Sequence, residues 1–177
     1  HDCAAAHLEL GLTYRDQARM EDAVDYFQLA VHFAPALVAG WLELGAGLAS
    51  LGRQKDALVA ARRATALEPR NCTAWLTLGN LLKTGGDWNG AIDCYRTAAA
   101  SDAQSAEAQC RLGYALYMVG RYAESRSAFD ASLALNPRMR ASVVSAKRRR
   151  IASQNPTYVA GHDRGVLPIG AWSTSST

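Results

Sequence analysis

Two segments of the chain decide its fold: WLELGAGLASLG at residues 41–52 and WLTLGNLLKTGG at residues 75–86. They place Trp, Leu and Gly at the same offsets, 34 residues apart. The Leu-Gly pair occurs four times at this interval, as Leu10-Gly11, Leu44-Gly45, Leu78-Gly79 and Leu112-Gly113. A fixed period of roughly 20–50 residues indicates stacked copies of one supersecondary unit, each burying its apolar face on its neighbours.

The apolar residues around each Leu-Gly pair have the spacing of an α-helix. Trp41, Leu44 and Leu48 lie at positions i, i+3 and i+7, which share one helix face. The glycine beside this face allows a partner helix to approach closely, which offsets the roughly 0.5–1 kcal/mol that glycine costs inside a helix. A seam of alanines within residues 57–64 predicts that this partner is a second helix of the same unit.

Punctuation residues separate the predicted helices. Glycine ends the first helix of three units, where a left-handed residue is usually needed, and proline follows three of the second helices because it cannot continue them. These residues are Gly52, Gly86 and Gly120, and Pro35, Pro69 and Pro137. The first unit has Ala18 at the glycine position, which predicts strain or a different turn there.

These positions together resemble the tetratricopeptide repeat family, whose pattern is W-x2-L-G-x2-Y, then A-x3-F, then P. The resemblance implies an all-α fold, a right-handed superhelical solenoid of four helix pairs. We place the repeats at 4–37, 38–71, 72–105 and 106–139. We expect residues 140–152 to form a capping helix that completes a domain at 1–152, and residues 153–177 to form an extended tail.

Composition narrows the function classes. The chain has 177 residues, 49% of them hydrophobic and 20% charged, as in ordinary globular proteins, and it contains no apolar run long enough for a transmembrane helix. Its four cysteines match no metal or haem motif, so we interpret them as small packing residues in a reducing, cytoplasmic compartment. The chain starts at His1 rather than Met, so we expect a fragment or a processed form whose missing segment could carry a targeting signal.

The sequence contains no motif for catalysis. It lacks a glycine-rich phosphate loop, HExxH and GxSxG. We therefore expect no catalytic residue, no cofactor and no metal, and a protein that is not an enzyme.

The resemblance also implies a binding surface, because first helices line a concave face that holds peptides in this family. We assign to partner binding the residues Leu12, Arg15, Leu42, Leu76, Asn80, Lys83, Tyr114 and Tyr117. The carboxylate clamp of some members is not expected, since leucines stand where it needs lysines and only Asn80 fits. An asparagine ladder is not expected either, because its positions hold Glu9, Glu43, Thr77 and Arg111.

What remains is recognition of an apolar segment. Tyr114 and Tyr117 would be its anchors, and Asn80 would bond its backbone. The alternative is that the leucines pack against their own second helices and the tyrosines are ordinary surface residues.

A basic cluster follows the repeats. Residues 1–137 carry a net charge of −3 and residues 138–177 a net charge of +6. The cluster comprises Arg138, Arg140, Lys147, Arg148, Arg149 and Arg150. It is interpreted either as a solvated cap or as a contact for an anionic partner. Nucleic acid is not expected on the repeats, because they are acidic.

Two classes of function stay open. The first is a scaffold or adaptor that binds a protein or an apolar peptide on the concave surface, as part of a multi-subunit complex. The alternative is the regulatory region of a larger enzyme, since similar arrays precede glycosyltransferase and sulfotransferase domains.

Overall fold

The computed structural model describes residues 2–139, which form eight α-helices and no strand. The helices are α1 (Asp2–Asp16), α2 (Met20–Phe33), α3 (Val38–Ser50), α4 (Gln54–Leu67), α5 (Cys72–Thr84), α6 (Trp88–Ser101), α7 (Ala106–Met118) and α8 (Tyr122–Leu135). A short 3-10 turn, η1 (Pro137–Met139), follows them. The predicted capping helix at 140–152 and the predicted tail at 153–177 lie outside the described residues.

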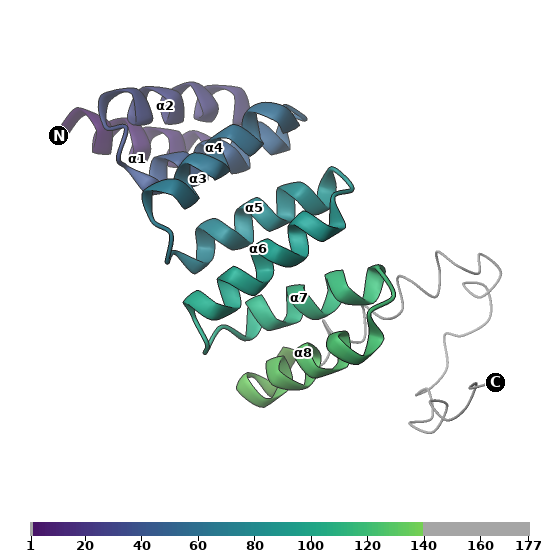
Figure 1. Cartoon of the computed structure of the whole chain (residues 1–177). Helices are drawn as coiled ribbons and strands as arrows, with labels where there is room; N and C mark the ends of the chain where they lie inside the picture. Colours follow the sequence, from purple (N-terminus) through teal and green to yellow (C-terminus); the bar gives the residue numbers. More distant parts are fainter. Residues whose placement is uncertain (1, 140–177) are drawn as a thin grey trace, which may run out of the picture.

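Consecutive helices pack as pairs that stack in chain order (Figure 1). The helix α1 packs on α2, α3 on α4, α5 on α6 and α7 on α8, and each of the first three second helices also packs on the next first helix. The helices α3, α5 and α7 begin 34 residues apart. The prediction of an all-α helical solenoid is therefore confirmed.

Tight turns join the two helices of each pair. Gly52, Gly86 and Gly120 have φ angles of 75°, 87° and 86°, in the left-handed region predicted from the sequence. Ala18 takes the same conformation in the first pair, with φ 60°, which costs a residue with a Cβ about 1 kcal/mol. The first turn thus keeps the geometry of the others at the expense of strain.

Polar groups fix the ends of the helices. The indole nitrogen of Trp41 donates to the carbonyl oxygen of Pro35 at 2.9 Å, and Trp75 does the same to Pro69 at 2.8 Å. Each tryptophan thereby ties a first helix to the proline that precedes it. The side chain of Asn71 caps α5 by accepting from the backbone of Ala74, at 3.0 Å.

The fourth pair replaces two core alanines with serines. Ser125 and Ser132 are 2% and 0% exposed. Their hydroxyls donate to the carbonyl oxygens of Gly113, at 2.8 Å, and Ala106, at 2.7 Å. Because both hydroxyls are paired, their burial does not leave an unsatisfied polar group in the core.

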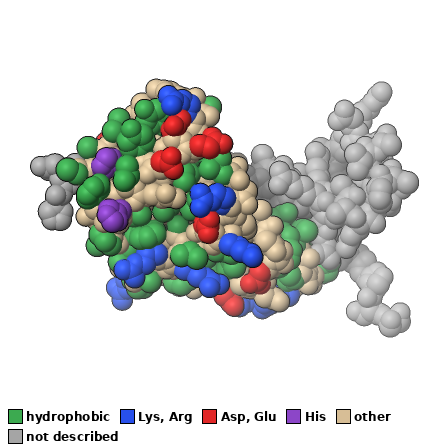
Figure 2. Space-filling model, turned by 90° about the horizontal axis from the view of Figure 1, so that it is seen from above, with side chains coloured by type: hydrophobic (Ala, Val, Ile, Leu, Met, Phe, Trp, Pro, Cys, Tyr) green, Lys and Arg blue, Asp and Glu red, His purple; other side chains and the backbone are tan. Residues whose placement is uncertain are grey.

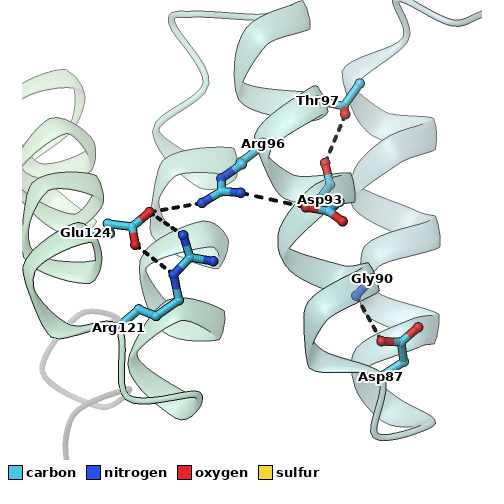
Figure 3. A network of polar contacts seen from close by, with 7 residues as sticks. All are labelled: Asp87, Gly90, Asp93, Arg96, Thr97, Arg121 and Glu124. Atoms are coloured by element: carbon cyan, nitrogen blue, oxygen red, sulfur yellow. Dashed lines mark hydrogen bonds and ion pairs between the residues drawn. The ribbon is translucent and has the colours of Figure 1, made fainter.

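Ion pairs join α6 to α8 on the outer surface (Figure 3). Arg96 and Arg121 both contact the Glu124 carboxylate, at 2.9 and 2.6 Å. The hydrogen bond from Arg121 is the main reason why the pKa of Glu124 lies below its ordinary value. Exposed pairs of this kind contribute little to stability, so the apolar core between the helices holds the stack together.

No helix among residues 2–139 has the length and hydropathy needed to cross a bilayer.

Candidate protein-binding surface

The first helices form one continuous face, because α3 contacts α5 and α5 contacts α7. We call this the first-helix face and define it by the half-buried and exposed side chains that α1, α3, α5 and α7 share. At its N-terminal half Arg15 of α1 donates to Glu43 of α3 at 2.6 Å and also contacts Asp16 at 3.2 Å. The guanidinium group is thus paired with two carboxylates.

Asn80 is the centre of the C-terminal half of the face. Its side-chain oxygen accepts a hydrogen bond from the Tyr95 hydroxyl of α6 at 2.8 Å. The same oxygen accepts from a guanidinium nitrogen of Arg111 of α7 at 2.7 Å. Three helices therefore meet at one amide oxygen.

These contacts fix the orientation of the Asn80 amide. A guanidinium group can only donate hydrogen bonds, so the atom that faces Arg111 must be the oxygen rather than the nitrogen. The amide nitrogen then points away from both partners, and no protein group among the described residues accepts from it. Asn80 consequently offers two oriented N–H donors at a half-buried position of the face.

Arg111 has little capacity left for an anionic ligand. Besides Asn80, it contacts Glu107 one turn earlier on α7 through two guanidinium nitrogens, with an Nε to Oε1 distance of 2.9 Å. Both arginines of the first-helix face are therefore neutralised by carboxylates. Such a face is suited to a neutral peptide segment better than to an acidic one.

An aromatic wall borders Asn80. The Tyr114 ring of α7 meets the Trp88 ring of α6 edge to face, with 5.9 Å between centroids. The Lys83 ammonium group lies 6.0 Å from the Tyr114 centroid, at the outer limit of a cation–π contact. Tyr114 stays half-buried, so one part of its ring remains on the surface.

Two of the predicted contact residues lie beneath the face. Leu76 and Tyr117 are only 8% and 9% exposed, and each packs in a core cluster. Leu12 and Leu42 are half-buried against core residues of their own repeats. The structure thus brings Asn80, Lys83 and Tyr114 together at the surface, with Arg15 on a separate part of the face.

The sequence patterns do not identify three residues of this site. Arg111 stands out in the sequence only as a departure from an asparagine ladder, Tyr95 only as a repeat position, and Trp88 belongs to no pattern. Their roles follow from the packing of α6 and α7 on α5. The only signal in the sequence is that each is larger or more polar than its counterpart in other repeats.

The basic cluster is described only at its start. Arg138 is exposed in the turn η1. Arg140, Lys147, Arg148, Arg149 and Arg150 lie outside the described residues.

The cysteines of the repeats differ in exposure. Cys94 and Cys110 are buried, and burial raises the pKa of the Cys94 thiol to about 11 and that of Cys110 above its ordinary value. Cys3 is exposed on α1. Within residues 2–139 no three His, Cys, Asp or Glu side chains gather in a way that could hold a metal ion.

The fold and its continuous first-helix face define an α-helical repeat solenoid. A model of the tetratricopeptide repeat matches residues 1–37 and 76–139, more than half of the chain. The chain belongs to the tetratricopeptide repeat family.

Solved structures support this fold. A crystal structure of MamA is 23% identical, covers 76% of this chain and 79% of its own, and superposes with a TM-score of 0.71. A thermophilic tetratricopeptide repeat protein of Thermus thermophilus, TTC0263, is 16% identical, with coverage of 88% and 93% and a TM-score of 0.68. At these identities the likeness concerns the fold alone. No curated protein matches the chain.

Proposed function

We propose that this chain is a protein-binding scaffold whose first-helix face holds an extended, apolar peptide segment of a partner. The observation that carries the proposal is the orientation of Asn80. Its amide oxygen is engaged by Tyr95 and Arg111, so its N–H donors are held toward the surface, where a peptide carbonyl oxygen could accept from them.

The surroundings of Asn80 favour a neutral segment. Arg111 is paired with Glu107, and Arg15 with Glu43, so neither offers an unpaired positive charge. The Tyr114 ring lies beside Asn80 and provides a flat apolar contact for a side chain of the peptide. Aromatic residues of this kind contribute a large share of the binding energy at interfaces.

The sharpest test is Asn80→Asp. A carboxylate keeps the oxygen that accepts from Tyr95 and Arg111, but it removes both N–H donors and turns an acceptor toward the peptide carbonyl. Peptides would be selected from a random library on the wild-type chain, and their dissociation constants measured for wild type and variant. We expect an enrichment of apolar segments and an affinity loss of at least about tenfold in the variant, or ~1.4 kcal/mol.

Asn89→Asp is the matched control, since Asn89 is an exposed asparagine on α6, away from the contacts of Asn80. It introduces the same charge and should leave affinity within about twofold. Thermal unfolding of all three proteins would establish that the fold is retained. Equal affinity of the wild type and Asn80→Asp would show that the first-helix face is not the binding site. Selection of acidic peptides with steep salt dependence would instead favour the basic cluster.

A further inference from the structure

The four leucines of the Leu-Gly pairs have the same register and different exposures. Leu44, Leu78 and Leu112 are 5%, 6% and 9% exposed. Leu10 is 43% exposed. The first three lie where α2, α4 and α6 pack on the next first helix, whereas α1 stands at the end of the stack with no described helix before it (Figure 1).

Other residues of α1 repeat this difference. Ala6 is exposed, while the corresponding Ala74 and Ala108 are 0% exposed. Thr13 is exposed, while the corresponding Gly47 is buried. With Cys3 and Gln17 they form a stripe at helical spacing, which we call the α1 end face: Cys3, Ala6, Leu10, Thr13 and Gln17. None of these residues is charged.

The junction between α2 and α3 shows what such a face accepts. Val31 and Val24 of α2 lie so close to Gly40 and Gly47 of α3 that an added Cβ would come within 2.9 and 2.8 Å of them. An apolar helix therefore lies directly on the positions of α3 that correspond to Ala6 and Thr13. The α1 end face continues this established interface and has the shape to receive an α-helix.

We infer that the α1 end face packs against α1 of a second copy of this chain, forming a two-fold symmetric dimer. A two-fold contact places a surface against itself. Because the face is uncharged, two copies meet without like-charge repulsion. The small side chains of Cys3 and Ala6 leave room beside them for Leu10 of the other copy.

The opposite end of the stack is unsuited to a head-to-tail contact. The residue of α8 that corresponds to Val24 is Arg126, whose side chain is 82% exposed. Head-to-tail stacking would bury this guanidinium group against the uncharged α1 end face, at a cost that a two-fold contact avoids. The surface seen in Figure 2 agrees, since hydrophobic side chains surround the histidines at one end and charged groups gather elsewhere.

The test is the oligomeric state of the 177-residue chain by sedimentation equilibrium across a wide concentration range. We expect wild type to follow a monomer–dimer equilibrium and Leu10→Arg to weaken the dimer at least about a hundredfold. Leu29→Arg is the matched control, since Leu29 is 40% exposed but lies on the outer surface of α2. It should change the dimerisation constant less than about threefold.

A second variant, Ala6→Glu, tests the same face with a different residue and should also yield monomer. Circular dichroism would verify that all variants keep their helices. A wild type that is monomeric at every concentration would overturn the inference, as would a dimer that survives both Leu10→Arg and Ala6→Glu. The result is independent of peptide binding, because Asn80 and Tyr114 lie on α5 and α7.

Discussion

The second and third helix pairs have the same helix lengths and the same Trp, Leu and Gly offsets, yet they fill the space between their helices differently. In the third pair the Tyr95 ring lies over Gly79, and an added Cβ would come within 2.6 Å of its Cε1 atom. In the second pair Ala61 replaces the aromatic residue. Gly45 then faces the backbone of α4, with the Ala57 oxygen 3.5 Å from an added Cβ.

The difference teaches that one sequence signature serves two purposes. At Gly45 the glycine lies beside the backbone of the partner helix, as the sequence predicts. At Gly79 it makes room for a ring. Only the ring carries a hydroxyl across to the first-helix face, where it bonds Asn80. The second pair has Ala46 at the position of Asn80, so its binding surface lacks both the tyrosine and the amide.

Tyr95→Ala should have the largest effect. The side chain is 1% exposed and fills the gap above Gly79, so its removal leaves a cavity and an unpaired Asn80 oxygen on one side. We expect the free energy of unfolding to fall by about 3–5 kcal/mol. Urea denaturation followed by circular dichroism measures this loss. A loss below about 1 kcal/mol, less than the usual cost of such a cavity, would mean that α5 and α6 can close together as α3 and α4 do, and the two pairs would be interchangeable.

Gly79→Ala comes next, and it tests the close approach directly. The added methyl group would lie 2.6 and 2.9 Å from two ring carbons of Tyr95. The ring has little freedom to move away, because its hydroxyl is bonded to Asn80 and the side chain is buried. We expect overpacking to lower the free energy of unfolding by about 1–3 kcal/mol, despite the better helix propensity of alanine.

Gly79→Ala in a Tyr95→Ala background is the control. Without the ring the methyl group has space, so the second substitution should then be neutral or stabilising. Additive losses would show that Gly79 is needed for a reason other than the ring.

The sequence predicted the fold because its determinants are local. Leucine, glycine and proline at fixed spacing specify the helices, their turns and their stacking, and even the left-handed Ala18 followed from its place in the register. The candidate site was predicted less completely. Asn80 and Tyr114 were identified, but the burial of Leu76 and Tyr117 depends on how α5 and α7 rotate against their neighbours, which repeat positions alone do not determine.

Tyr95→Phe isolates the hydroxyl and should have a smaller effect. It keeps the ring above Gly79 but removes the donor to Asn80, so we expect a loss of about 0.5–1.5 kcal/mol. Burial raises the pKa of Tyr95 from 10.0 to about 12, which means that folding favours the neutral hydroxyl. The difference between wild type and variant should therefore be constant below about pH 10 and should shrink as the pH rises from about 10 to about 12. Urea titrations at several pH values measure it, and a difference that grows over this range would contradict the assignment.

Gly45→Ala should have the smallest effect, and of opposite sign. Its nearest neighbours would be the Ala57 oxygen at 3.5 Å and two further atoms at 3.7 Å, which are ordinary contacts. Alanine restricts the unfolded chain and favours helix, so we expect the free energy of unfolding to rise by about 0.5–1 kcal/mol. The same substitution thus stabilises one pair and destabilises the next because Ala61 occupies the place of Tyr95. If Gly45→Ala instead destabilised the chain as much as Gly79→Ala, close approach of the helix backbones alone would explain the glycine in every repeat.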